Sequence, residues 1–159
     1  MKIEQIMSKD VATCCPDETL SDAARIMWER DCGFVPIVDG AEQRRVVGAV
    51  TDRDLCMASY TRGQALGEIC IRDVMSTGIR TCKASDDLQA AESILREARI
   101  HRLPVVDDAG QLLGVLSLAD IAREAARETG ARRKQVTTQE VGEVLADIRE
   151  PRRIGAASV

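Results

Sequence analysis

The chain has 159 residues, of which 45% are hydrophobic and 30% charged, and its formal net charge is −4. No apolar run is long enough to span a membrane, and aromatic residues make up only 2% of the chain, too few for a basic surface interleaved with stacking rings. We therefore expect a cytoplasmic globular protein that binds neither membrane nor nucleic acid. Because the segment MKIEQIMSKD lacks the apolar block of a secretory signal, the six cysteines are expected as free thiols, mostly small core residues.

The first half of the chain predicts a strand, a helix, two strands and a second helix. VATC, which ends at Cys14, is a short extended segment, and apolar residues then recur at helical spacing from Leu20 to Met27. Two apolar runs follow, FVPIVD and VVGAVT, separated by a polar turn segment. Leu55, Met57 and Ala58 begin the closing helix.

The same elements recur in the second half. Met75 stands 68 residues after Met7, and the segments that start at these two residues align without a gap up to the first strand of each pair. After a two-residue contraction, VVGAVTDRDL falls on LLGVLSLADI. The coincident pairs are Met7/Met75, Ser8/Ser76, Thr13/Thr81, Cys14/Cys82, Leu20/Leu88, Ala23/Ala91, Pro36/Pro104, Val38/Val106, Asp39/Asp107, Gly48/Gly114, Thr51/Ser117 and Asp54/Asp120.

Both predicted first helices have start signals. Thr19 with Asp22, and Ser85 in the second copy, carry oxygens that can accept hydrogen bonds from the amides of a first helical turn. In the second copy the helix carries Leu88 to Leu95, and the closing helix begins at Ile121.

A unit of about sixty residues is marginally stable alone, so the two copies are expected to pack together. The fold class is therefore α/β (α+β), with two pseudo-symmetric β-α-β-β-α repeats in one module. We place the first repeat at residues 1–67, the second at 68–127, and a charged tail at 128–159. The clefts between the halves are expected as a related pair, lined by strand ends and helix starts.

The tail departs from the repeat. It is charged from Arg127 to Lys134, and TTQE, which ends at Glu140, can cap a short helix carrying apolar residues up to Ile148. Pro151 is expected to end that helix. The basic clusters RRK and RR of the tail are interpreted as solvated charge, with binding of an acidic partner as the alternative.

The segment TDRD, from Thr51 to Asp54, has two interpretations. A hydroxyl followed by an acid three residues later can be a capping box at a helix start. The same helix start can also bind a phosphate, while a fixed carboxylate accepts hydrogen bonds from a ribose diol. In the second copy Ser117 and Asp120 keep the hydroxyl and the acid, whereas Asp52 and Arg53 are replaced by other residues. Because capping alone would not require both groups to be kept, the repeat favours the interpretation as a ligand site.

The repeated G-h-h-T/S-x-x-D element (h meaning apolar), with its upstream strands VPIVD and LPVVD, resembles the CBS domain family in its usual tandem arrangement. The resemblance covers roughly Met7 to Arg127. It implies pseudo-twofold pairing of β-α-β-β-α units, frequent dimerisation into a flat disc, and binding of AMP, ADP, ATP or S-adenosylmethionine between the copies.

The resemblance also implies roles for individual residues. Asp54 and Asp120 resemble the ribose-binding acids, Thr51 and Ser117 the phosphate-side hydroxyls, and Thr13 and Thr81 lie in the segment that contacts the base. The cations best placed to meet phosphates are Arg53, His101 and Arg102. Because the second copy has Ala119 in place of Arg53, and the first has Gly33-Phe34 in place of His101-Arg102, the two clefts are expected to differ.

The favoured function is a non-catalytic regulatory module that senses an adenine nucleotide and acts on a separate protein, with a homodimer expected and no resident cofactor or metal. Two alternatives remain open: a ligand-free dimerisation module, and a redox or metal sensor built on Cys14, Cys15 and Cys82. His101, Ser117 and Asp120 have the residue types of a hydrolase triad, but the serine stands in no G-x-S-x-G turn, so no catalytic residue is expected.

Overall fold

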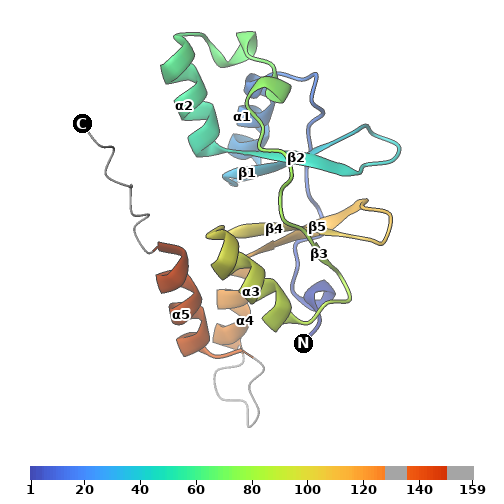
Figure 1. Ribbon diagram of the computed structural model, residues 1–159, viewed down its shortest axis with the longest axis vertical. Helices are drawn as coiled ribbons and strands as arrows, with labels where there is room; N and C mark the ends of the chain where they lie inside the picture. The colour runs from blue at the N-terminus through green and yellow to red at the C-terminus, as the bar shows by residue number, and fades with distance from the viewer. Residues whose placement is uncertain (128–135, 150–159) are drawn as a thin grey trace, which may run out of the picture.

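The computed structural model describes residues 1–127 and 136–149, in which helices flank two small sheets (Figure 1). No helix in these ranges has the length and apolar character needed to cross a membrane. In chain order the elements are η1 (Ile3–Gln5), α1 (Leu20–Glu29), β1 (Phe34–Val38), β2 (Val46–Thr51), α2 (Asp52–Arg62), η2 (Leu66–Glu68), η3 (Ile71–Asp73), β3 (Cys82–Lys83), α3 (Leu88–Ala98), β4 (Arg102–Val106), β5 (Leu112–Ser117), α4 (Leu118–Arg127) and α5 (Thr138–Arg149).

The predicted strand pairs form in both repeats. β1 pairs antiparallel with β2, and β4 pairs antiparallel with β5 in the same register, so that Phe34 faces Thr51 and Arg102 faces Ser117. β3 adds a parallel strand beside β4, and Cys14 makes the equivalent parallel bridge beside β1. The mixed α and β architecture predicted from the repeat is confirmed.

One predicted helix start is confirmed and the other is wrong. The Thr19 hydroxyl accepts a hydrogen bond from the Asp22 amide, which closes the capping box of α1. α3 instead begins after Asp87, whose side chain makes no capping hydrogen bond. The Asp87 carboxylate instead forms an ion pair with Lys2 at 3.0 Å.

The two hydrophobic cores do not follow the order of the chain. Ile3, at the amino terminus, is fully buried in the core formed by α3, α4 and β3–β5. Ile69 and Ile71, which lie in the segment that leads to Met75, are buried in the core of the first repeat. Each repeat is thus completed by the segment that leads into the other, while the division of the chain at residue 67 stays a prediction.

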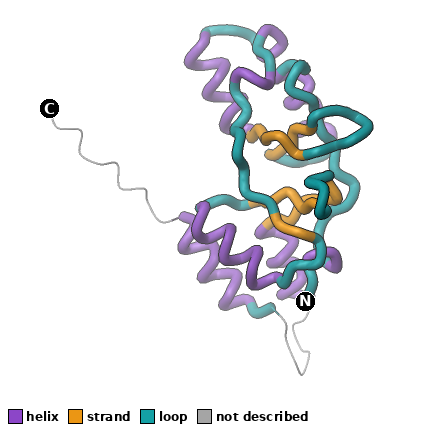
Figure 2. Tube along the Cα trace, turned by 45° about the vertical axis from the view of Figure 1, so that its right-hand side comes forward, coloured by secondary structure: helices purple, strands orange, loops and turns teal. Residues whose placement is uncertain are grey.

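Two extended segments cross between the repeats beside the strands (Figure 2). Ser8 exchanges two backbone hydrogen bonds with Val115 of β5, at 3.0 and 2.9 Å, and Ser76 does the same with Ala49 of β2, at 3.1 and 3.0 Å. Gly48 and Gly114 leave room for this approach, because a Cβ at either position would lie 2.7 or 2.6 Å from a serine carbonyl oxygen of the crossing segment. The repeated glycines therefore serve backbone contacts between the repeats.

The tail helix predicted from TTQE is confirmed as α5. The Thr137 hydroxyl and Glu140 carboxylate form the expected capping box. Val144 and Ile148 are buried against the second repeat, where α5 lies beside α3 and α4 (Figure 1). Pro151 and the tail's basic clusters lie outside the described residues.

The crossing segments generate a first prediction. Gly48→Ala and Gly114→Ala are each expected to lower the free energy of unfolding by about 1–3 kcal/mol, because the added methyl group must displace a backbone carbonyl. Urea denaturation measures the loss. Gly142→Ala in α5 is the matched control: its Cβ meets nothing within 4 Å, so it should stabilise the helix by up to about 1 kcal/mol. Equal stability of all three variants would contradict the packing role.

Candidate functional site: two clefts between the repeats

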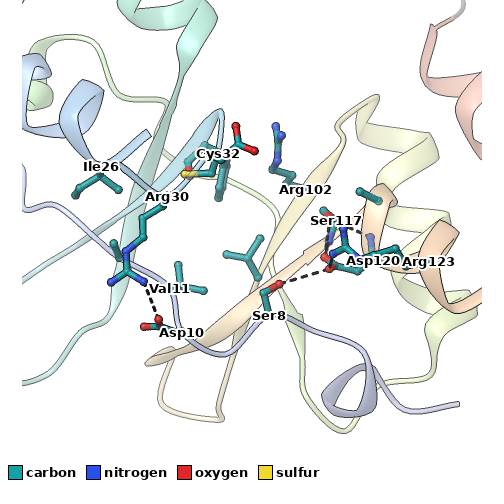
Figure 3. A pocket seen from close by; sticks show the side chains of 15 residues that line it. Ser8, Asp10, Val11, Ile26, Arg30, Cys32, Arg102, Ser117, Asp120 and Arg123 are labelled. Atoms are coloured by element: carbon teal, nitrogen blue, oxygen red, sulfur yellow. Dashed lines mark hydrogen bonds and ion pairs between the residues drawn. The ribbon is translucent and has the colours of Figure 1, made fainter. Parts of the chain in front are cut away.

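Two clefts lie where the repeats meet, as the pseudo-symmetry predicted. The Asp120 cleft has a volume of about 360 Å³ and is drawn in Figure 3. It is lined by Ser8, Asp10, Val11, Ala12, Ile26, Arg30, Asp31, Cys32, Phe34, Arg102, Val115, Ser117, Ala119, Asp120 and Arg123. The Asp54 cleft has a volume of about 480 Å³ and is lined by Phe34, Ala49, Thr51, Arg53, Asp54, Ser76, Gly78, Ile79, Arg80, Ala98, Arg99, Ile100, His101, Arg102 and Pro104.

The repeat relates the walls of the two clefts. Each cleft combines a crossing segment, which contributes residues 8–12 in one case and 76–80 in the other, with the start of a closing helix in the opposite repeat. The backbone pairs Ser8–Val115 and Ser76–Ala49 hold these walls together. Both clefts therefore depend on contacts that join the two halves of the chain.

The geometry of Thr51 and Asp54 shows the capping box of TDRD and leaves room for a ligand beside it. The Asp54 Oδ2 atom accepts hydrogen bonds from the Thr51 amide and hydroxyl, both at 2.8 Å, and the Thr51 hydroxyl accepts one from the Asp54 amide. This is a capping box at the start of α2. Both residues nevertheless line the cleft, and the structure gives the Asp54 Oδ1 atom no hydrogen bond from another described residue. One carboxylate oxygen closes the cap and the other is available to a ligand.

Asp120 is more strongly engaged than Asp54. It is 6% exposed, and its Oδ2 atom accepts hydrogen bonds from the Ser117 amide at 2.8 Å and hydroxyl at 2.5 Å. Its Oδ1 atom accepts a hydrogen bond from the Ser8 hydroxyl at 3.4 Å and pairs with Arg123. Figure 3 shows Ser8 and Arg123 converging on this carboxylate. A ligand in this cleft must compete with protein groups for Asp120.

The Asp120 cleft is balanced in charge. Its three arginines face three aspartates, and Arg30 pairs with Asp10 at 2.7 Å on the wall opposite Asp120 (Figure 3). With Arg123 held by Asp120, two of the three arginines already have a carboxylate partner within the cleft. The surroundings of this cleft give an anion little net attraction.

The Asp54 cleft has a surplus of positive charge. Four arginines line it, namely Arg53, Arg80, Arg99 and Arg102, against the single carboxylate of Asp54. His101 adds no charge near neutral pH, because burial and then the positive charges of Arg149 and Arg102 lower its pKa below 6.5. Within the described part of the chain, the side chains of Arg53 and Arg102 have no ion pair. Guanidinium groups in this state can bind phosphate.

The structure brings together most of the predicted site residues. Thr51, Asp54, Arg53, His101 and Arg102 share the Asp54 cleft, and Ser117 and Asp120 share the other. Thr13 and Thr81 line neither cleft; Ala12 and Arg80, the residues just before them, occupy those walls instead.

Several charged wall residues were missed by sequence reasoning. Arg30, Arg80, Arg99 and Arg123 line the clefts, and the repeat sets Arg80 against Ala12 and Arg99 against Asp31. A position-by-position comparison of charge between the copies is the signal that could have found them.

The structure gives no support to chemistry by cysteine or by a serine triad. Burial raises the pKa of the Cys14 and Cys82 thiols to about 12, and the two lie in different cores. All six cysteines are free, but only these two are buried and Cys56 is exposed, so the expectation of core residues holds in part. His101 lines the Asp54 cleft whereas Ser117 lines the other, and no group of three or more His, Cys, Asp or Glu residues within the described ranges could hold a metal ion.

Comparison with known proteins assigns the family. The sequence profile of the CBS domain matches residues 3–60 and 71–127, which are the two repeats. The chain belongs to the CBS domain family. The CBS domain-containing protein YhcV of Bacillus subtilis is 32% identical over 120 residues, which cover 76% of this chain and 82% of YhcV. The uncharacterized protein MK0525 of Methanopyrus kandleri is 32% identical over 121 residues, which cover 76% of this chain but only 61% of MK0525.

A solved CBS structure contains a ligand. The crystal structure of CBSX2 in complex with AMP has a TM-score of 0.70 and 25% sequence identity to this chain, covering 80% of this chain and 98% of CBSX2. The tandem CBS arrangement expected from the repeated element is thus confirmed.

The unequal anchoring of the two acids in this CBS pair generates a second prediction. Asp120→Ala is expected to lower the free energy of unfolding by about 2 kcal/mol, and Asp54→Ala by about 1 kcal/mol, because Asp120 satisfies a second hydroxyl and an arginine beyond its capping box. Urea denaturation gives both values. Asp10→Ala, which removes an exposed carboxylate from the cleft rim, serves as the control and should change stability by less than about 1 kcal/mol. A greater loss in Asp54→Ala than in Asp120→Ala would contradict the difference.

Proposed function

We propose that this chain is a non-catalytic regulatory module that binds an adenine nucleotide in the Asp54 cleft. The observation that carries the proposal is the combination, in one cleft, of a carboxylate with one oxygen available and four arginines. A ribose diol can donate two hydrogen bonds to a fixed carboxylate, and arginines bind phosphate oxygens in pairs. AMP in the CBSX2 structure supports an adenylate as the ligand class.

The charge of the Asp54 cleft favours ligands with several phosphates. AMP carries up to two negative charges and ATP up to four, whereas S-adenosylmethionine has no phosphate. A cleft in which four arginines face one aspartate attracts each added phosphate. We therefore rank ATP and ADP above AMP, and AMP above S-adenosylmethionine, for this cleft.

The proposed ligand would act by holding the two repeats in one relative position. The Asp54 cleft takes Asp54 from the first repeat and His101 and Arg102 from the second. A ligand that contacts both sides stabilises the arrangement in which these walls are closest, and a separate protein can read that shift. The same shift can reach α5, because the positive charge of Arg149 lies near enough to lower the pKa of His101.

The proposed nucleotide site generates a third prediction. Calorimetric titration should give saturable binding in the order ATP, ADP, AMP and S-adenosylmethionine. Asp54→Ala should abolish the tightest phase, and Arg53→Gln should weaken ATP about tenfold, as expected for loss of one charged hydrogen-bonding group.

Arg25→Gln is the matched control for charge, since Arg25 lies on α1 and pairs with Glu29 outside both clefts. It should leave ATP affinity unchanged. If none of the four compounds gives heat or raises the melting temperature at millimolar concentration, the nucleotide hypothesis fails and the capping interpretation of TDRD stands.

A homodimer through the α1–α2 face is the second part of the proposal. Trp28 of α1 and Tyr60 of α2 are 89% and 81% exposed. In the second repeat, the position equivalent to Trp28 is Arg96, which pairs with Asp147 of α5 at 3.6 Å. α5 thus lies beside the position of the second repeat that is equivalent to Trp28, whereas Trp28 itself is exposed on the first repeat. Trp28 and Tyr60 are the only tryptophan and the only tyrosine of the chain. A second copy, meeting this face with its own α1 and α2, is the occupant we propose.

The single tryptophan makes dimerisation directly measurable, which is the fourth prediction. On raising the concentration, the emission of Trp28 should shift to shorter wavelength as sedimentation reports a dimer, because association removes the indole from water. Tyr60→Glu should raise the dissociation constant at least tenfold while keeping the reporter, and Tyr60→Phe should leave it close to wild type. A monomer with water-exposed emission at about 100 μM would exclude this interface.

A further inference from the structure

Arg102 occupies a position that belongs to both clefts. It is the first residue of β4, directly opposite Ser117 of β5, and it lines the Asp120 cleft and the Asp54 cleft alike. Among the described residues only Phe34, its counterpart in the first repeat, is also shared. The pseudo-twofold relation thus places one aromatic ring and one guanidinium group between the two clefts, and only the guanidinium group carries charge.

The shared guanidinium group decides the charge of the smaller cleft. Without Arg102, the Asp120 cleft has two arginines, Arg30 and Arg123, against three aspartates. Both of these arginines are held in ion pairs, with Asp10 and Asp120 respectively. Arg102 is therefore the cation of this cleft that remains available to a ligand, and its presence brings the cleft from a net negative charge to neutrality.

The net charge of the Asp54 cleft depends less on Arg102. Arg53, Arg80 and Arg99 remain there when Arg102 is discounted, and they still outnumber the single carboxylate of Asp54. A polyphosphate in this cleft nevertheless attracts the Arg102 side chain, because a guanidinium group gains a strong, charge-assisted hydrogen bond there. The two clefts compete for one cation, and the Asp54 cleft provides the stronger attraction once it holds phosphate.

We propose that Arg102 is a shared specificity residue that makes anion binding in the two clefts mutually unfavourable. This inference rests on the proposed nucleotide site. When ATP in the Asp54 cleft engages Arg102, the Asp120 cleft is left with surplus negative charge and rejects a second phosphate-bearing ligand. The Asp120 cleft then accepts uncharged or cationic adenosine derivatives in preference to nucleotides, so the module responds to two chemically different ligands.

The test compares AMP binding to the Asp120 cleft when the Asp54 cleft is empty and when it is filled. Asp54→Ala, which cannot use its own cleft, gives the AMP dissociation constant for the empty state by calorimetry. The wild-type chain saturated with ATP gives the value for the filled state. The ratio of the two constants is the coupling, which we expect to be about fivefold or more in favour of the empty state.

Arg102→Gln, introduced into both backgrounds, should bring this ratio to about one. Arg53→Gln is the matched control, because Arg53 lines only the Asp54 cleft; at saturating ATP it should keep the ratio of the wild type. Adenosine in place of AMP should give a ratio near one in every background, since it carries no phosphate. Circular dichroism and melting temperature establish that each variant is folded.

The outcomes separate this inference from the proposed function. If no adenylate binds the wild-type chain, the nucleotide site fails and the shared role of Arg102 fails with it. If adenylates bind and the ratio is one in the wild type, or remains fivefold in Arg102→Gln, the nucleotide site stands and the shared role is overturned.

Discussion

The architecture depends on two extended segments that cross between the repeats. Their reciprocal backbone hydrogen bonds, Ser8 with Val115 and Ser76 with Ala49, attach the start of each repeat to the last strand of the other. Such pairs require close approach of two backbones, which Gly114 and Gly48 permit. Because the same segments form walls of both clefts, one structural constraint both joins the halves and creates the space between them.

The two repeats have equivalent backbones but different side chains, and this difference gives the two clefts different charges. The capping boxes of Thr51–Asp54 and Ser117–Asp120 have the same hydrogen bonds, so the helix starts are equivalent. The crossing segments and strand starts are not equivalent: one cleft has four arginines against one aspartate, whereas the other has ion pairs between its arginines and aspartates. The symmetry of the backbone thus creates two clefts, and differences between their side chains make the clefts unlike.

The tail helix α5 extends the same asymmetry to the outer surface. Val144 and Ile148 bury part of the second repeat, while Trp28 stays exposed on the first. The dimer that we propose would use the open half. The proposed ligand cleft and the proposed dimer contact then lie on different parts of the pseudo-symmetric pair.

Single residues show most clearly how much of the fold and of the candidate site could be predicted from the sequence. The pairing of hydroxyl and acid in Thr51–Asp54 and in Ser117–Asp120 could be predicted directly from the sequence, because a capping box involves residues only three positions apart. Ser85 was expected to cap α3, but the helix begins after Asp87, whose carboxylate forms an ion pair with Lys2 near the amino terminus of the chain. Arg30, which ends α1, and Arg80, which lies on a crossing segment, were missed because they line the clefts only when the two repeats have packed together.

The sequence by itself determined the doubled β-α-β-β-α pattern, the caps of α1 and α5, and the pair of unequal ligand-site candidates. Periodicity and capping act over a few residues, and a repeat can be compared with itself. Tertiary structure alone decided which segment completes which core, how the arginines are divided between the clefts, and that Arg102 lies in both. Those outcomes depend on contacts between residues far apart in the chain, whose partners are fixed only when both repeats have packed.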